Sequence, residues 1–228
     1  MTAPLTLISS MATRQILNDL AADYERRTGQ AVKVESVGGV DAAKRVQAGE
    51  AFDLVVLAAN AIDQLAAAGK TAGPRKDLVT SGVAVAVKAG APRPAIDSEE
   101  AVKQAVLGAQ SLAYSTGPSG VQLAKLFERW GIAAEIQPRI VTAPPGVPVG
   151  SLVAKGEVAL GFQQLSEMLN LEGIDILGPL PDAIQIVTTF SGAVAATSTR
   201  AAEAQAVLDF MAGPEAAGAI RRQGMAPA

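Results

Sequence analysis

The chain carries the stretch SLAYSTGPSG at residues 111–120, followed by a helical pattern from Val121 to Gly131. Its apolar part predicts a strand over Leu112–Ser115, and the hydroxyl- and glycine-rich residues Thr116–Gly120 predict a loop that leads into the helix. This order is typical of an α/β fold. The N–H groups of a first helical turn lack intrahelical partners and favour an anion. The alternative is an ordinary capped helix, with Thr116 or Ser119 as its cap.

The same alternation of strand and helix runs along the whole sequence. Further strands are predicted at residues 5–8, 31–37, 52–58, 79–88, 136–141, 159–162 and 185–194. Helices are predicted at 11–28, 42–48 (with Asp41 as N-cap), 61–68, 98–108, 149–155, 201–211 and 214–222. Strands that alternate with helices favour parallel sheets with right-handed crossovers. Because there are too many strands for one small sheet, we expect two lobes.

The amino-acid composition limits the kinds of binding and catalysis that this chain can perform. The 228 residues are 49% hydrophobic but only 4% aromatic, which indicates a core of Ala, Val, Leu and Ile. A net charge of −3 gives no basic surface for nucleic acid. The sequence has no Cys and no His, which excludes disulfides, thiol chemistry and Ser-His triads. We therefore expect no metal and no cofactor, and any catalysis would fall to Asp, Glu, Lys or Tyr.

Small-molecule sites in such sheets lie beyond the carboxyl ends of the strands. Four loops fit that position: Ser9-Ser10, Gly38-Gly39, Thr116–Gly120 and Gly146–Val149. The candidate ligand-binding residues are Ser9, Ser10, Gly38, Gly39, Ser115, Thr116, Ser119, Gly120, Val147, Gln163 and Gln164. The serines and Thr116 have a second interpretation as helix caps, and the glutamines as solvent-facing residues. Glu167 is the candidate general base, with an ordinary surface carboxylate as the alternative.

Five segments together resemble a known family. They are Ser9–Thr13 after the first strand, Val46–Val56, Gly117–Gly120 before a helix that ends at Trp130, Val153–Gly161, and Phe210–Ala217. Their order and spacing are similar to those of type II periplasmic solute-binding proteins, in the molybdate-binding branch, over the whole chain.

The resemblance implies two α/β lobes, each a mainly parallel sheet flanked by helices. One lobe would comprise residues 1–83 and 190–228, and the other residues 84–189, with the ligand in a cleft between them. It also implies a monomer that delivers a small anion to the membrane subunits of an ABC transporter. The expected location is the periplasm. We find no apolar run of transmembrane length and no signal-peptide pattern, so the cytoplasm is the alternative.

The molybdate site of that family matches only in part. Ser10 corresponds to its first serine, whereas Gly38-Gly39 stand where a second serine is expected and Gln164 where a tyrosine is expected. Lost donors in a buried site cost roughly 1–3 kcal/mol each. We therefore expect an organic carboxylate, with molybdate or tungstate as one alternative. Some relatives in this branch resemble aconitate isomerase, which implies a second alternative: an enzyme that moves a proton in an unsaturated carboxylic acid.

Overall fold

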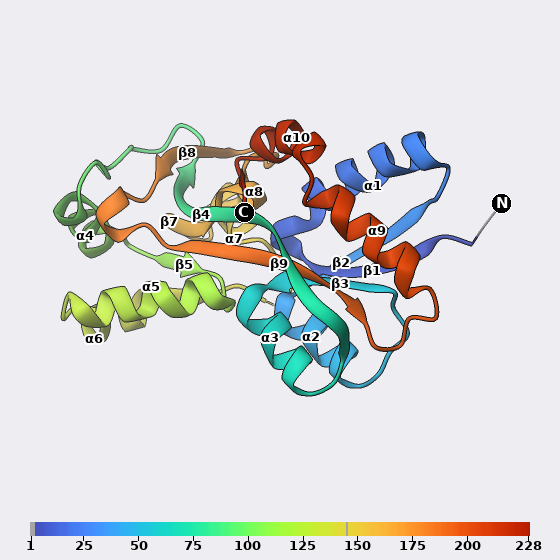
Figure 1. Ribbon diagram of the computed structural model, residues 1–228. Helices are drawn as coiled ribbons and strands as arrows, with labels where there is room; N and C mark the ends of the chain where they lie inside the picture. The colour runs from blue at the N-terminus through green and yellow to red at the C-terminus, as the bar shows by residue number, and fades with distance from the viewer. Residues whose placement is uncertain (1–2, 145) are drawn as a thin grey trace. The chain divides into compact units, whose positions relative to one another are not determined.

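The computed structural model describes residues 3–144 and 146–228 and confirms the α/β fold (Figure 1). The chain divides into two compact units. Unit 1 is formed by the residues up to Ser81 together with Thr188–Ala228, and unit 2 is Gly82–Val187. The predicted ligand cleft between two lobes stays a prediction. Of the helices in the described ranges, none combines the length and apolar character that a membrane crossing requires.

Unit 1 is built on a mixed sheet with the strand order β2-β1-β3-β9-β4. The strands are β1 (Leu5–Ser10), β2 (Val32–Val37), β3 (Leu54–Ala58), β4 (Thr71–Lys88) and β9 (Val187–Ala195), with the short β10 (Ala226–Pro227) antiparallel to β4. β1 lies parallel to both β2 and β3, and β9 runs antiparallel to β3. The carboxyl ends of β1, β2 and β3 therefore lie at one edge of the sheet.

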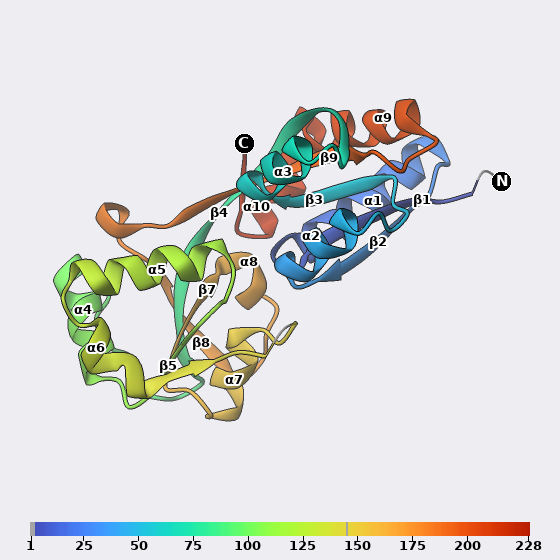
Figure 2. The same ribbon diagram turned by 90° about the horizontal axis from the view of Figure 1, so that it is seen from below.

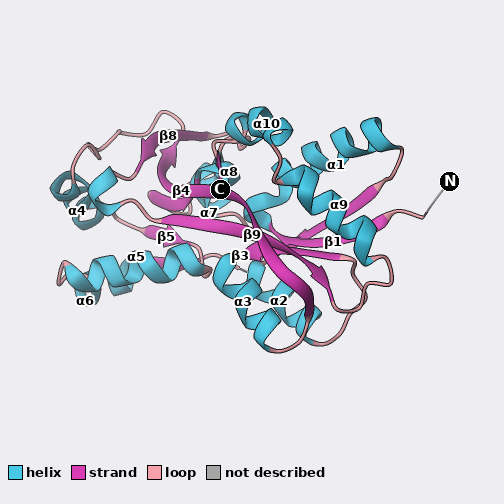
Figure 3. Cartoon of the chain, viewed as in Figure 1, coloured by secondary structure: helices cyan, strands magenta, loops and turns pink. Residues whose placement is uncertain are grey.

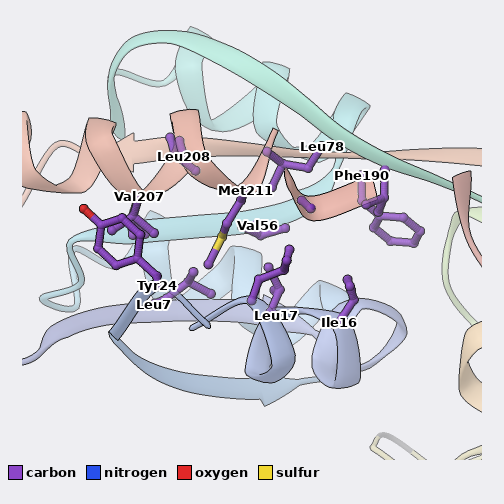
Figure 4. Close-up of a cluster of buried hydrophobic side chains, with 14 of the residues drawn as sticks. Leu7, Ile16, Leu17, Tyr24, Val56, Leu78, Phe190, Val207, Leu208 and Met211 are labelled. Atoms are coloured by element: carbon purple, nitrogen blue, oxygen red, sulfur yellow. The ribbon is translucent and has the colours of Figure 1, made fainter. Parts of the chain in front are cut away.

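Helices cover both faces of this sheet because successive residues of a strand point to opposite sides. Leu7 of β1 packs with side chains of α1 (Arg14–Thr28) and α9 (Ala201–Met211), in the cluster shown in Figure 4. Its neighbour Ile8 packs instead with α2 (Gly39–Gln47) and α3 (Ala59–Ala67). The remaining elements of the unit are η1 (Met11–Thr13), η4 (Pro214–Ala216) and α10 (Ala217–Arg222).

Unit 2 has the strand order β4-β7-β5-β6, with β8 paired to β4. Its own strands are β5 (Leu112–Tyr114), β6 (Ile140–Thr142), β7 (Leu160–Gln164) and β8 (Ile174–Pro179), and β5 is parallel to both β6 and β7. Leu112 packs against Phe127 on one face, where α4 (Glu99–Gly108), α5 (Pro118–Arg129) and α6 (Ala133–Ile136) lie. Ala113 packs against Val153 of α7 (Val149–Lys155) on the other. Figure 2 shows α5 and α7 with the unit 2 strands. The elements η2 (Gln137–Arg139), α8 (Leu165–Met168) and η3 (Asp182–Ile184) complete the unit.

Several predicted elements were wrong (Figure 3). The strand expected at 79–88 begins at Thr71, and its exposed first half, with a glycine and a proline, does not look like a strand in sequence. The strand expected at 136–141 is largely α6 and η2, and only residues 140–142 are extended. Asp41 is not a cap: Gly38 occupies that position, and Asp41 lies in the first turn of α2. β8 and β10 were not predicted.

Candidate functional site

The two adjacent serines at the end of β1 have opposite surroundings. Ser9 is directly opposite Ser36 in the parallel pairing of β1 with β2, and the two hydroxyl oxygens lie 2.7 Å apart. Ser10 faces the other side of the sheet. Its Oγ is buried and has no hydrogen-bond partner, the one such side-chain atom found among residues 3–144 and 146–228. Because a buried hydroxyl without a partner is costly, it marks a place where a ligand atom is expected.

The start of α2 lies beside that hydroxyl. A Cβ atom at position 39 would stand 3.5 Å from the Cβ of Ser10, which places the Gly39 backbone in contact distance of the serine. Gly38 is the N-cap and supplies no side-chain bond, so the N–H groups of the first turn depend on other acceptors. Ser10, Gly38 and Gly39 thus form one group of neutral donors in unit 1, and Ser9 belongs to the cross-strand pair instead.

In unit 2, the loop after β5 folds back onto the start of α5. The hydroxyl oxygens of Ser115 and Ser119 are 3.1 Å apart. A Cβ atom at position 120 would stand only 1.6 Å from the carbonyl oxygen of Ser115, so the close approach of this carbonyl requires glycine. The expectation that Thr116 or Ser119 caps the helix is wrong. Gly117 is the N-cap without a side-chain bond, and Pro118 begins the helix because its missing N–H costs nothing there.

A cavity of about 180 Å³ adjoins this loop. Its lining includes three predicted site residues, Ser115, Thr116 and Gly120, and it also includes residues that the sequence analysis did not select: Tyr114, Val121, Ala124, Ile140 and Thr142. Burial raises the pKa of the Tyr114 phenol. Ile140 and Thr142 belong to β6, the strand predicted with the wrong bounds. A correct strand end at Thr142 would have placed its hydroxyl among the candidates.

The two adjacent glutamines at the end of β7 are both buried and belong to alternate positions of the strand. Gln163 lies two residues after Gly161 and therefore on the same face of β7. A Cβ atom at position 161 would stand 2.5 Å from the Val153 side chain, so this face of β7 is the one that α7 covers. The Gln163 Oε1 atom accepts a hydrogen bond of 3.1 Å from the Gly150 N–H. Gln164 lies on the opposite face of β7, together with Phe162. The predicted pair therefore does not act as one group.

Glu167 lies on α8, four residues after Gln163, and accepts a hydrogen bond of 2.6 Å from Gln163 Nε2. Burial raises the pKa of the Glu167 carboxyl to about 7, although the bond from Gln163 acts to lower it. A carboxyl with such a pKa is ionised in about half of the molecules near neutral pH, the condition that suits a general base.

Val147 differs from the other loop candidates. Its backbone N–H donates to the carbonyl oxygen of Pro144 across 3.0 Å, and its side chain packs against the cluster around Val149 and Val153. The hydrogen-bonding capacity of this N–H is therefore already used within the loop.

Solved structures show which class of protein has this fold. The periplasmic molybdate-binding protein of Azotobacter vinelandii matches with a TM-score of 0.80 at 21% identity, over 97% of this chain and 98% of that chain. The sulfate-binding protein SubI of Mycobacterium tuberculosis H37Rv matches with a TM-score of 0.81 at 17% identity, over 99% and 87%. The fold is therefore that of the periplasmic binding proteins, and at these identities the likeness shows the fold alone.

The sequence establishes the family. The model of the family described as bacterial extracellular solute-binding protein matches residues 5–226, and the chain belongs to that family. A protein named aconitate isomerase, from Pseudomonas sp, is 39% identical over 230 residues, which are 98% of this chain and 87% of that protein. The resemblance to the molybdate-binding branch, and to aconitate isomerase within the same fold, is confirmed.

Proposed function

We propose that the chain binds a small unsaturated polycarboxylate and isomerises it by moving one proton, as an enzyme of the aconitate isomerase type. The observation that carries the proposal is the hydrogen bond from Gln163 to Glu167, which holds a carboxyl whose pKa is raised by burial to about 7, in the same unit as the hydroxyl-rich loop. The relative at 39% identity supports the same reaction class. This assigns a catalytic role to the residue that the sequence analysis named only as a candidate base.

The proposed step needs one base and a set of neutral donors. Ionised Glu167 takes a proton from the carbon next to the double bond, and the electron pair of that C–H bond forms the new double bond as the old one shifts. The charge passes through a dienolate onto carboxylate oxygens. Glu167 then returns its proton to the far carbon, so that no oxidant, reductant or cofactor is consumed. Donors aimed at the charged oxygens lower the barrier.

The structure offers such donors in each unit. Ser10 with the first turn of α2 can hold one carboxylate in unit 1. In unit 2 the Ser115–Ser119 hydroxyl pair and the first turn of α5 are suited to another. Neutral hydroxyl and amide groups bind a carboxylate without a buried cation, and helix N-termini add favourable electrostatic potential. The same donors suit a tetrahedral oxyanion, so the preference for a carboxylate over molybdate or tungstate rests on the relative at 39% identity.

The family membership favours a second candidate, in which the chain captures the carboxylate without turnover. It would then act as a periplasmic, monomeric receptor that passes its ligand to an ABC transporter. Solute-binding proteins of this family act extracellularly, and one solved relative is described as the substrate-binding domain of a putative molybdenum ABC transporter.

One set of measurements separates these functions. The purified chain is incubated with cis-aconitate and the trans isomer is followed by proton NMR, beside a Glu167→Gln sample. Turnover that the substitution abolishes supports the isomerase. Calorimetry against di- and tricarboxylates, molybdate, tungstate and sulfate then tests the ligand class. Tight binding of a tricarboxylate without turnover would favour the receptor, and binding of molybdate and tungstate alone would contradict both carboxylate functions.

A further inference from the structure

Gln163 connects the candidate base to the start of α7. Its Oε1 accepts from the N–H of Gly150 at 3.1 Å, and its Nε2 donates to Glu167 Oε2 at 2.6 Å. A backbone N–H can only donate, so the oxygen of the amide must be the atom that faces Gly150. The nitrogen must consequently be the atom that faces Glu167. The backbone of α7 thus fixes which end of the amide reaches the carboxyl.

We propose that Gln163 is a positioning residue that holds Glu167 by Oε2 and leaves Oε1 to take and return the substrate proton. The proposal rests on the isomerase function above. Among the described residues, Oε1 of Glu167 makes none of the hydrogen bonds found, whereas Oε2 is fixed by the amide. One oxygen is therefore anchored, and the other stays available for proton transfer.

The same bond sets the pH range in which Glu167 is ionised. Burial favours the neutral carboxyl, and the Nε2 donor favours the carboxylate, so the two effects oppose each other at one group. Without the donor, the pKa would rise further and a smaller fraction of Glu167 would act as a base at neutral pH. The amide thus keeps the base usable in a site that would otherwise neutralise it.

No other charge contributes to this balance among the described residues. β7 carries no ionisable side chain, and α8 carries none besides Glu167. Met168 of α8 packs against Ala84 and Ala86 of β4, with Ile174 and Ile176 of β8 beside them. The ionisable residues of β4, β8 and α7 are Arg75, Lys76, Asp77, Lys88, Asp175 and Lys155, and none of them is a cause of the shift.

A direct titration tests the proposal without relying on turnover. The chain is labelled with ¹³C at the glutamate carboxyls, and the Glu167 signal is assigned by its loss in Glu167→Gln. We expect a midpoint near 7 in the unsubstituted chain. Gln163→Met keeps the length of the side chain but removes both polar atoms, and should move the midpoint upward by roughly one unit. The acid limb of kcat should move with it.

Two further variants complete the test. Gln163→Glu keeps an acceptor for the Gly150 N–H but replaces the donor, and the two carboxyls should titrate as a coupled pair with one midpoint above that of the unsubstituted chain. If Gln163→Met fails to fold, Gln163→Glu still tests whether the Glu167 midpoint depends on the residue at position 163. Gln185→Met is the matched control, because it removes an amide that bonds Val83 and Leu180 in the same unit without touching Glu167. Its Glu167 midpoint should not change.

The outcomes separate the inference from the proposed function. An upward shift in both Gln163 variants, with none in Gln185→Met, supports the anchoring of Glu167 Oε2 by Gln163. If aconitate is then not turned over, the isomerase function and the proton-transfer role of Oε1 fail together, while the anchoring stands. An unchanged Glu167 midpoint in both Gln163 variants overturns the inference. An equal shift in Gln185→Met also overturns it, since the effect would then come from general loosening of unit 2.

Discussion

Replacing each of the adjacent serines of β1 by alanine should change stability in opposite directions. The Ser10 hydroxyl is buried without a partner, and such a group costs about 1–3 kcal/mol. Ser10→Ala removes that cost and should stabilise the ligand-free chain by about 1 kcal/mol, once the small loss of packing is subtracted. Ser9→Ala breaks the 2.7 Å contact with Ser36 and should destabilise it by about 1 kcal/mol.

For a chain of 228 residues, 1 kcal/mol corresponds to a shift of about 2–4 °C in Tm. Thermal unfolding followed by circular dichroism should therefore separate the two variants by about 4–8 °C. The order reverses for ligand binding. A hydrogen bond to a charged ligand contributes about 1.5–3 kcal/mol, so Ser10→Ala should weaken carboxylate binding about ten- to a hundredfold in calorimetry, whereas Ser9→Ala should have little effect. If Ser10→Ala lowers Tm as much as Ser9→Ala does, the Ser10 hydroxyl has a partner within the chain and is not an unused donor for a ligand.

Three further predictions concern unit 2. Gly120→Ala would place its Cβ 1.6 Å from the Ser115 carbonyl oxygen, so the loop must move; urea unfolding should show a loss of about 1–3 kcal/mol, and calorimetry a weaker anion site. Gly161→Ala would bring its Cβ within 2.5 Å of Val153, and we expect a similar loss of stability, with a normal urea midpoint as the contradicting result. Burial raises the pKa of Glu167 from 4.5 to about 7, so the folded state keeps a proton that the unfolded chain releases. The unsubstituted chain should lose up to about 3 kcal/mol of stability as the pH rises through this window, and Glu167→Gln should not. Urea midpoints of the two proteins that change in the same way between pH 4.5 and 8 would contradict the raised pKa of Glu167.

The fold was predictable from local patterns because most elements of this chain are strongly periodic. β3 is buried along its whole length, and α1 places Ile16, Leu20 and Tyr24 on one face. Prediction failed where tertiary contacts decide the conformation. The first half of β4 is exposed and is held extended by sheet pairing. It contains a glycine and a proline, which are rare in strands, so its sequence does not predict one.

The candidate site was predictable in part. The hydroxyl- and glycine-rich loops could be found because residue type and position after a strand both point to donors, as at Ser10 and Ser119. What sequence could not reveal is which neighbours each side chain meets on its face of the sheet. Gln163 meets the Gly150 N–H of α7, and the strand pairing places Ser9 opposite Ser36. The raised pKa of the Glu167 carboxyl also depends on neighbours that only the folded chain brings together.

The discontinuity of unit 1 has a consequence for how the chain is made on the ribosome. Leu7 and Ile16 emerge early, yet their core partners Val207 and Met211 lie near the end of the polypeptide, after all of unit 2. Unit 2 is a single uninterrupted segment, so it can complete its own packing while translation continues. Until the last helices appear, the apolar surface of the nascent N-terminal third stays uncovered. A chaperone that holds unfolded chains would therefore bind this segment most strongly during that interval.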